Sequence, residues 1–100
     1  MEIKFHGHSC FEITDGETTV LTDPFLKPNN PVAVATAEEV KADVIAVSHG
    51  HADHIADAIP VSKATGAHVV AIVEVANWLD AHGAAEVSDP NLGGTVNFDW

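Results

Sequence analysis

Three histidines and one aspartate stand within six consecutive residues, at positions His49, His51, Asp53 and His54. In an extended segment, residues two apart project to the same side, so the side chains of His49, His51 and Asp53 can converge. Imidazole nitrogens together with a carboxylate suit Zn²⁺ and related divalent ions in catalytic sites. Gly50, between the first two histidines, permits a tight turn. The segment therefore predicts a divalent-metal site; the alternative is a solvated His-rich loop that binds nickel or zinc incidentally.

The sequence on either side of these residues predicts the elements that position them. Residues 43–48 form a β-branched apolar run that is typical of a buried, parallel strand. A helix is expected over residues 55–65, ending at Gly66. Pro60 falls inside this range and either kinks the helix or confines it to its C-terminal part. The candidate ligands thus follow a strand directly and lead into a helix.

Period-2 patterns and turn residues predict the remaining elements. Further strands are expected over residues 2–5, 10–14, 18–22, 68–72 and 95–98, with Asp15-Gly16 as a hairpin turn. A capping box from Thr36 to Glu39 predicts a short helix, and another helix is expected over residues 75–82, before Gly83. The order is a β-meander followed by β-α-β-α-β, which indicates an α/β or α+β fold.

Composition excludes several classes of protein. The chain has 100 residues with Asp+Glu 15 against Lys+Arg 4, a formal net charge of -11, and 46% apolar residues. This length allows one small domain or part of a larger one. The cations are scattered along the chain and include no arginine: they are Lys4, Lys27, Lys41 and Lys63. Nucleic-acid binding is therefore disfavoured, because a polyanion is recognised by clustered cationic side chains.

Cysteine use and apolar runs point to the cytoplasm. One cysteine, Cys10, excludes an internal disulfide framework and fits an apolar strand pattern, where it is expected as a small core residue. The N-terminus lacks a basic segment followed by an apolar one, so no signal peptide is expected. The longest apolar runs, such as residues 69–73, are too short to span a bilayer. We therefore expect no membrane partner.

The segment His49-x-His51-x-Asp53-His54 resembles the hallmark motif of the metallo-β-lactamase superfamily. The flanking segments resemble those of the bacterial and archaeal metal-dependent hydrolases, a branch of the superfamily that the ascorbate-phosphate lactonases also resemble. The flanking segments that carry this resemblance are Gly7-His8-Ser9-Cys10-Phe11, Thr22-Asp23-Pro24-Phe25, Val47-Ser48-His49 and Asn91-Leu92-Gly93-Gly94-Thr95. This resemblance implies an αββα sandwich. Residues 1–100 would form its N-terminal half, in a single metallo-hydrolase domain whose C-terminal half is absent.

The resemblance also implies a role for each candidate residue. His49 and His51 would ligate a first metal, and Asp53 and His54 a second, with zinc expected and manganese or iron as alternatives. Asp53 would in addition act as a catalytic residue that accepts a proton from the attacking water. Asp23 would hydrogen-bond the metal loop from behind and so orient the ligands. The alternative for Asp23 is an ordinary Asp-Pro turn.

The other histidines receive weaker assignments. His8 matches a position near the active site of this branch, although it also fits a strand-end histidine with a satisfied ring. No ligand position matches His6, His68 or His82, and we expect these at the surface or at strand edges. Trp78 is expected to pack within its helix.

The implied function is hydrolysis of a lactone, ester or phosphodiester, a small-molecule substrate, by a metal-activated water. In the superfamily a second half supplies one more histidine for each metal and a bridging aspartate. Two alternatives follow for a chain that lacks them: a non-catalytic metal-binding fragment, or a subunit whose sandwich is completed by a separate C-terminal half. A sheet covered on one face only would also expose apolar surface and favour a homo-oligomer.

Overall fold

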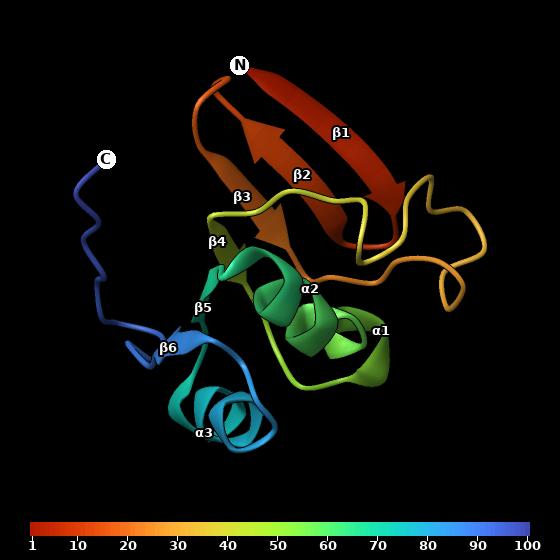
Figure 1. Cartoon of the computed structure of the whole chain (residues 1–100). Coiled ribbons are helices and arrows are strands. Elements are labelled where there is room, and N and C mark those ends of the chain that lie inside the picture. The colour runs from red at the N-terminus through yellow and green to blue at the C-terminus, as the bar shows by residue number, and fades with distance from the viewer.

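The computed structural model describes all 100 residues as one mixed α/β unit built around a single sheet (Figure 1). The strands are β1 (Glu2–Gly7), β2 (Cys10–Thr14), β3 (Thr19–Thr22), β4 (Val44–Ala46), β5 (His68–Val70) and β6 (Glu86–Ser88). The helices are α1 (Ala52–Ile55), α2 (Ala58–Thr65) and α3 (Val73–Ala81). The sheet has six strands in chain order, β1-β2-β3-β4-β5-β6. The predicted fold class and the β-meander are therefore confirmed.

The first three strands pair antiparallel, and a tight turn joins β2 to β3. The Asp15 carboxylate accepts hydrogen bonds from the N–H groups of Glu17, at 2.9 Å, and Thr18, at 2.8 Å. Bonding to Thr18 and Glu17 holds the pKa of the Asp15 carboxyl below its usual range. Gly16 follows at φ 103°, a conformation that glycine adopts without steric cost. The Asp-Gly pair thus makes the predicted turn.

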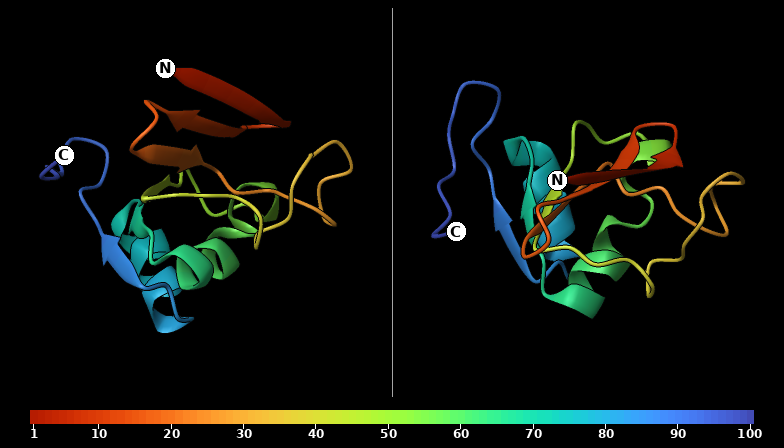
Figure 2. Two further views of the ribbon diagram at one scale, coloured as in Figure 1. Left: turned by 45° about the horizontal axis from the view of Figure 1, so that its top comes forward. Right: turned by 90° about the horizontal axis from the view of Figure 1, so that it is seen from above.

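From β3 onward the strands are parallel, so each connection must cross the sheet. Such crossovers are right-handed, and because they run in one direction they place α1, α2 and α3 on the same side of the sheet (Figure 2). A row of paired residues, Leu21, Ile45 and Val69, faces these helices and is fully buried. Val61 of α2 and Leu79 of α3 belong to the same hydrophobic core. The core therefore lies between the sheet and one helical layer.

The opposite face of β1 and β2 is apolar and exposed. Ile3, Phe5 and Phe11 point away from the core, with 61%, 56% and 37% of their surface exposed. The rings of Phe5 and Phe11 lie on paired residues with centroids 4.8 Å apart. Near β5, the C-terminal segment covers part of this face, where the Phe98 ring contacts His68. Apolar surface on one face of the sheet is thus open, as the sequence predicted.

The short helix predicted at the capping box is absent. One of the two bonds of a capping box is present, since the Thr36 N–H donates to Glu39 Oε1 at 3.0 Å. The backbone, however, forms only a turn, in which the Glu39 N–H bonds Thr36 O at 3.1 Å. By Asp43 the chain must be extended again, because the Asp43 N–H bonds Thr19 O at 2.8 Å. The segment is too short to offset the cost of nucleating a helix.

The predicted strand over residues 95–98 was wrong, and the sixth strand is β6 at Glu86–Ser88. This strand pairs with β5 directly after the return from α3. It has only three residues and begins with an exposed glutamate, so it offers too few alternating positions for a period-2 pattern to be detected. A short, charged strand of this kind is typical of a sheet edge.

The helix predicted over residues 55–65 is divided into α1 and α2. Pro60 is the third residue of α2. Its missing N–H is harmless there, because the N–H groups of the first helical turn have no partner within the helix. The helix ends at Gly66, φ 76°, as predicted. Of the three helices, none has the length and apolar character needed to cross a bilayer.

Candidate metal centre

The histidine-rich segment lies at the carboxyl end of β4, where the chain passes into α1 (Figure 1). Pairing with β5 continues one residue past the strand, since the Val47 N–H donates to Val70 O at 3.0 Å. The chain then turns, and His51 occupies the position before α1, with its carbonyl accepting the His54 N–H at 2.9 Å. The ligand segment is thereby anchored at both ends.

His8 reaches the same place from the turn between β1 and β2. Gly7 precedes it at φ 99°, and a Cβ on Gly7 would lie 2.2 Å from Cγ2 of Val32. Only glycine fits this bend, after which His8 itself adopts φ 59°. The turn directs the His8 ring toward α1.

His8, Asp53 and His54 form one group of donor atoms. His8 Nε2 lies 2.9 Å from Asp53 Oδ2 and 3.3 Å from His54 Nε2. His54 Nε2 is in turn 3.6 Å from Asp53 Oδ1. One atom from each residue falls within 4.8 Å of the others, a spacing compatible with a shared ion. The sequence placed His8 near the site, and the structure brings it into the same group as Asp53 and His54.

His49 and His51 form a second group beside the first. His49 Nε2 lies 3.1 Å from His51 Nδ1. The His49 ring also contacts the His54 ring, with centroids 3.9 Å apart, so the two groups adjoin. The structure therefore brings the side chains of His49, His51, Asp53 and His54 together, and their assignment to two metals stays a prediction.

Asp23 lies behind this cluster and is almost fully buried, with 5% of its surface exposed. Its Oδ2 is 2.9 Å from His54 Nδ1, and its Oδ1 accepts the Ser48 N–H at 2.7 Å. Its backbone has φ 36°, in the left-handed region that aspartate tolerates better than most residues. The carboxylate thus bonds Ser48 and His54, 25 and 31 positions away in the sequence.

Ser48 is the contact that sequence reasoning missed. Its hydroxyl donates to Asp23 Oδ2 at 2.6 Å and lies 2.9 Å from His49 Nδ1. Its place directly before the first histidine, at the end of a buried strand, was the available signal. A serine in that place can reach both the strand end and the ligand ring.

The positions of the protons on the histidine rings are compatible with binding of a divalent ion by these donor atoms. Because Asp23 accepts the Nδ1 proton of His54, the Nε2 atom of neutral His54 carries a lone pair that faces Asp53 and His8. In the metal-free protein a proton on His8 Nε2 can be shared with these acceptors. A cation can take the place of that proton, and imidazole with carboxylate is a set that zinc accepts.

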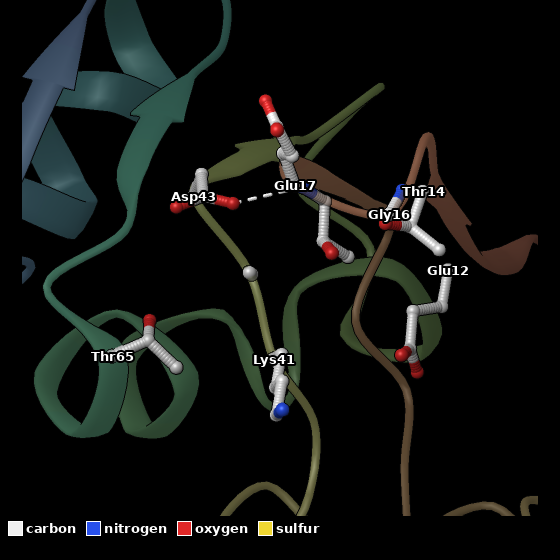
Figure 3. Close-up of a pocket in the computed structure, with 9 residues that line it drawn as sticks. Glu12, Thr14, Gly16, Glu17, Lys41, Asp43 and Thr65 are labelled. Carbon is white, nitrogen blue, oxygen red and sulfur yellow. Dashed lines mark hydrogen bonds between the residues drawn. The ribbon is translucent and has the colours of Figure 1, made fainter. Parts of the chain in front are cut away.

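The two larger hollows of the surface lie outside the histidine cluster. The larger, of about 510 Å³, is near the start of β3 and β4, and Figure 3 shows its polar lining, which includes Glu12, Glu17, Lys41 and Asp43. Asp43 is already engaged there by the Thr19 N–H at 2.8 Å. The smaller, of about 370 Å³, adjoins the metal loop and is lined by Gly50, Ile55, Glu74, Val75 and Trp78. Only the smaller one borders the ligand segment.

The remaining sequence predictions have mixed outcomes. His6 lies on the edge strand β1, as the strand-edge expectation allows, but it is fully buried rather than at the surface. It faces the core side of the sheet, where its Nε2 lies 3.0 Å from a Glu12 carboxylate oxygen. His82 is exposed, as predicted. Trp78 is 47% exposed and stacks on His82, so it contributes less to packing than expected. Cys10 is buried in the core, as predicted, and burial raises the pKa of its thiol to about 11.

A known protein family and several solved structures are similar to this chain. Residues 2–96 match the description of a beta-lactamase superfamily domain. The chain belongs to the β-lactamase superfamily. Among solved structures, a novel metallo hydrolase, Igni18, from the archaeon Ignicoccus hospitalis superposes on 97% of the chain with a TM-score of 0.82 and 30% identity. A possible metal-dependent hydrolase from Veillonella parvula shares the fold, with a TM-score of 0.68 over 91% of the chain and 17% identity.

Relatives in sequence carry the name UPF0173 metal-dependent hydrolase. The chain is 46% identical over 99 residues to the relative from Thermoplasma acidophilum and 43% identical over 99 residues to one from Thermus thermophilus. In Methylacidiphilum infernorum the identity is 39% over 100 residues. The chain spans 43–44% of the length of these superfamily relatives, and 42% of each solved structure.

Proposed function

We propose that this superfamily member contributes the principal metal-binding side chains of a hydrolase that acts on a lactone, ester or phosphodiester. The observation that carries the proposal is the convergence of His8, Asp53 and His54 on one point, with His49 and His51 beside them. Hydrolase relatives at 39–46% identity support the reaction class.

We assign the two donor groups to two divalent ions. His49, through Nε2, and His51, through Nδ1, would hold the first ion, because these atoms face each other across 3.1 Å. Asp53 and His54 would hold the second, and His8 adds a third donor that the sequence did not assign to it. Zinc is the expected ion, with manganese or iron as alternatives, since mixed nitrogen and oxygen sites accept several metals.

The chain's own residues would orient these ligands and move a proton. A divalent ion, when bound, supplies Lewis acidity that lowers the pKa of water toward neutrality and polarises a carbonyl or phosphoryl group. Asp53 has 47% of its side chain exposed and faces the open side of the cluster, where it would accept a proton from the attacking water. Asp23 has no such access, and its role would be to hold His54 from behind.

The donor count suggests that further ligands come from elsewhere. Catalytic zinc is normally held by three protein ligands, and the first group offers two. We propose that the missing donors belong to a segment that corresponds to the rest of the relatives' length, in the same or a separate polypeptide. Metal binding without turnover is the second candidate for these 100 residues by themselves, favoured by this shortage. A small-molecule substrate and a cytoplasmic location stay predictions.

A chimera tests the function. The chain would be fused to the part of the Thermus thermophilus relative that it does not match, and assayed with zinc or manganese on 4-nitrophenyl acetate, bis(4-nitrophenyl) phosphate and a simple lactone. We expect the 100-residue chain to give the rate of free metal, and the chimera to exceed it. His51→Ala should remove the gain, whereas His82→Ala, at an exposed histidine away from the cluster, should retain it. A folded, metal-loaded chimera without any gain contradicts the proposal.

A further inference from the structure

The Ser48 hydroxyl joins the two halves of the candidate metal centre. It lies 2.6 Å from Oδ2 of Asp23 and 2.9 Å from Nδ1 of His49. Asp23 Oδ2 also contacts His54 Nδ1 at 2.9 Å. One chain of polar contacts therefore runs from the first donor group, through Ser48 and Asp23, to the second.

The number of protons available in this series of polar contacts determines which atom carries each proton. A hydroxyl has one proton to donate, and an ionised carboxylate only accepts. The close contact with Asp23 is favourable only if the hydroxyl proton lies between the two oxygens. The hydroxyl oxygen then has lone pairs left for His49, so Nδ1 of His49 must be the donor in that contact. Neutral His49 consequently carries its proton on Nδ1 and has a bare Nε2.

The opposite arrangement is disfavoured. If the hydroxyl donated to His49, two oxygens would face each other at 2.6 Å with no proton between them. Asp23 cannot turn away from this repulsion, because the Ser48 N–H holds its Oδ1 at 2.7 Å and it is almost fully buried. An unrelieved contact of this kind costs more than a neutral hydrogen bond contributes.

We propose that Ser48 is a positioning residue that fixes the Nδ1–H tautomer of His49 and so presents the bare Nε2 atom to the first metal. The consequence for metal binding rests on the proposed function, whereas the tautomer itself does not. Since Nε2 faces His51 Nδ1 at 3.1 Å, the tautomer decides whether these two nitrogens can hold a cation together.

The tautomer is measured directly in the metal-free chain. Long-range ¹H–¹⁵N correlation spectra at about pH 8, where free imidazole is neutral, distinguish the two forms. We expect Nδ1–H for His49 in the wild-type chain and in Ser48→Thr, which keeps the hydroxyl. Ser48→Ala should shift His49 toward Nε2–H. Ser88→Ala is the matched control, because it removes a serine hydroxyl 2.6 Å from the distant His68 Nε2.

Zinc calorimetry on the same variants supplies the second readout. We expect Ser48→Ala to bind about tenfold more weakly, the lower end of the usual effect of losing a group that orients a ligand, and Ser48→Thr to restore the affinity. An Nε2–H tautomer in the wild-type chain overturns the proposal, even if Ser48→Ala does not fold. The proposal is also overturned if Ser48→Ala folds and keeps both the wild-type tautomer of His49 and the wild-type zinc affinity. An inactive chimera with the Nδ1–H tautomer would instead overturn the proposed function alone.

Discussion

Nδ1 of His54 lies 2.9 Å from Oδ2 of Asp23, so the opposite ring nitrogen of His54 is directed toward Asp53 and His8. This contact joins the end of β3 to α1 across 31 residues of sequence. It holds the ring in one orientation and gives the buried carboxylate a partner. A carboxylate that orients a histidine in this way raises the basicity of the ring nitrogen on the far side.

Asp23→Asn should therefore weaken zinc binding by about 10–100-fold, the range typical of lost ligand-orienting partners. An asparagine has one acceptor oxygen. If that oxygen keeps the Ser48 hydroxyl and His54, the amide NH₂ faces the Ser48 N–H, which Oδ1 of the carboxylate accepts. Calorimetry measures the loss, and circular dichroism checks that the fold is retained. Asp43→Asn is the control, since Asp43 also accepts a backbone N–H but lies away from the cluster. Unchanged zinc affinity in Asp23→Asn would show that Asp23 does not orient the ligands and only forms its Asp-Pro turn.

The sequence predicted those features that depend on residues close together in the chain. The spacing of His49, His51, Asp53 and His54 predicted that these side chains converge, and the structure brings them together. Their division into two metal-binding pairs came from the family resemblance and stays a prediction. Asp15-Gly16 gave the hairpin turn, and Gly66 gave the helix end. In each case the deciding contacts span a few residues.

Features that depend on distant contacts were missed or misjudged. The place of His8 in the donor group depends on a turn 45 residues before Asp53, which local pattern does not reveal. His6 is buried on the core side of the sheet, where its ring contacts Glu12 across the hairpin and its carbonyl accepts a hydrogen bond from Asn30, 24 residues away. The strand β6 forms because α3 returns the chain to the sheet edge, not because of its own three-residue pattern.

His8→Ala should weaken the tighter of the two metal sites. The group that contains His8 offers three donors, and the His49–His51 pair offers two, so the first equivalent of cobalt should occupy the former. Cobalt titration followed by absorption should show about tenfold weaker first binding in His8→Ala, and little change in His51→Ala. His82→Ala should behave as wild type. The reverse order, with His51→Ala losing the tight site, would exclude His8 as a ligand.

Cys10 should resist thiol reagents until the pH is strongly alkaline. Burial, chiefly, raises the pKa of its thiol from 9.0 to about 11. Because the folded-state value is the higher one, its contribution to the free energy of unfolding is full below about pH 9 and is lost as the pH rises through 11. Denaturant unfolding of wild type and Cys10→Ala at pH 8 and pH 10.5 should show the steeper alkaline loss in wild type. Parallel losses in both would contradict this.

The exposed apolar face should make the chain self-associate. Ile3, Phe5 and Phe11 present adjoining apolar side chains on β1 and β2. Sedimentation velocity should therefore show association that increases with concentration, and Phe5→Ser with Phe11→Ser should reduce it. Val34→Ser is the control: it removes a similarly exposed apolar side chain from a loop and should not reduce the association. A wild-type chain that stays monomeric at high concentration would remove the case for a homo-oligomer.

The central claim is that the clustered histidines, rather than histidine content in general, bind the metal. Zinc calorimetry should compare the wild-type chain with two double variants: His51→Ala with His54→Ala, and His68→Ala with His82→Ala. We expect the first double variant to lose binding by at least about tenfold and the second to match wild type. Binding in the wild type should also weaken at acidic pH, because protons compete for the imidazole nitrogens. Equal zinc affinity in wild type and in the His51→Ala, His54→Ala variant would contradict the account.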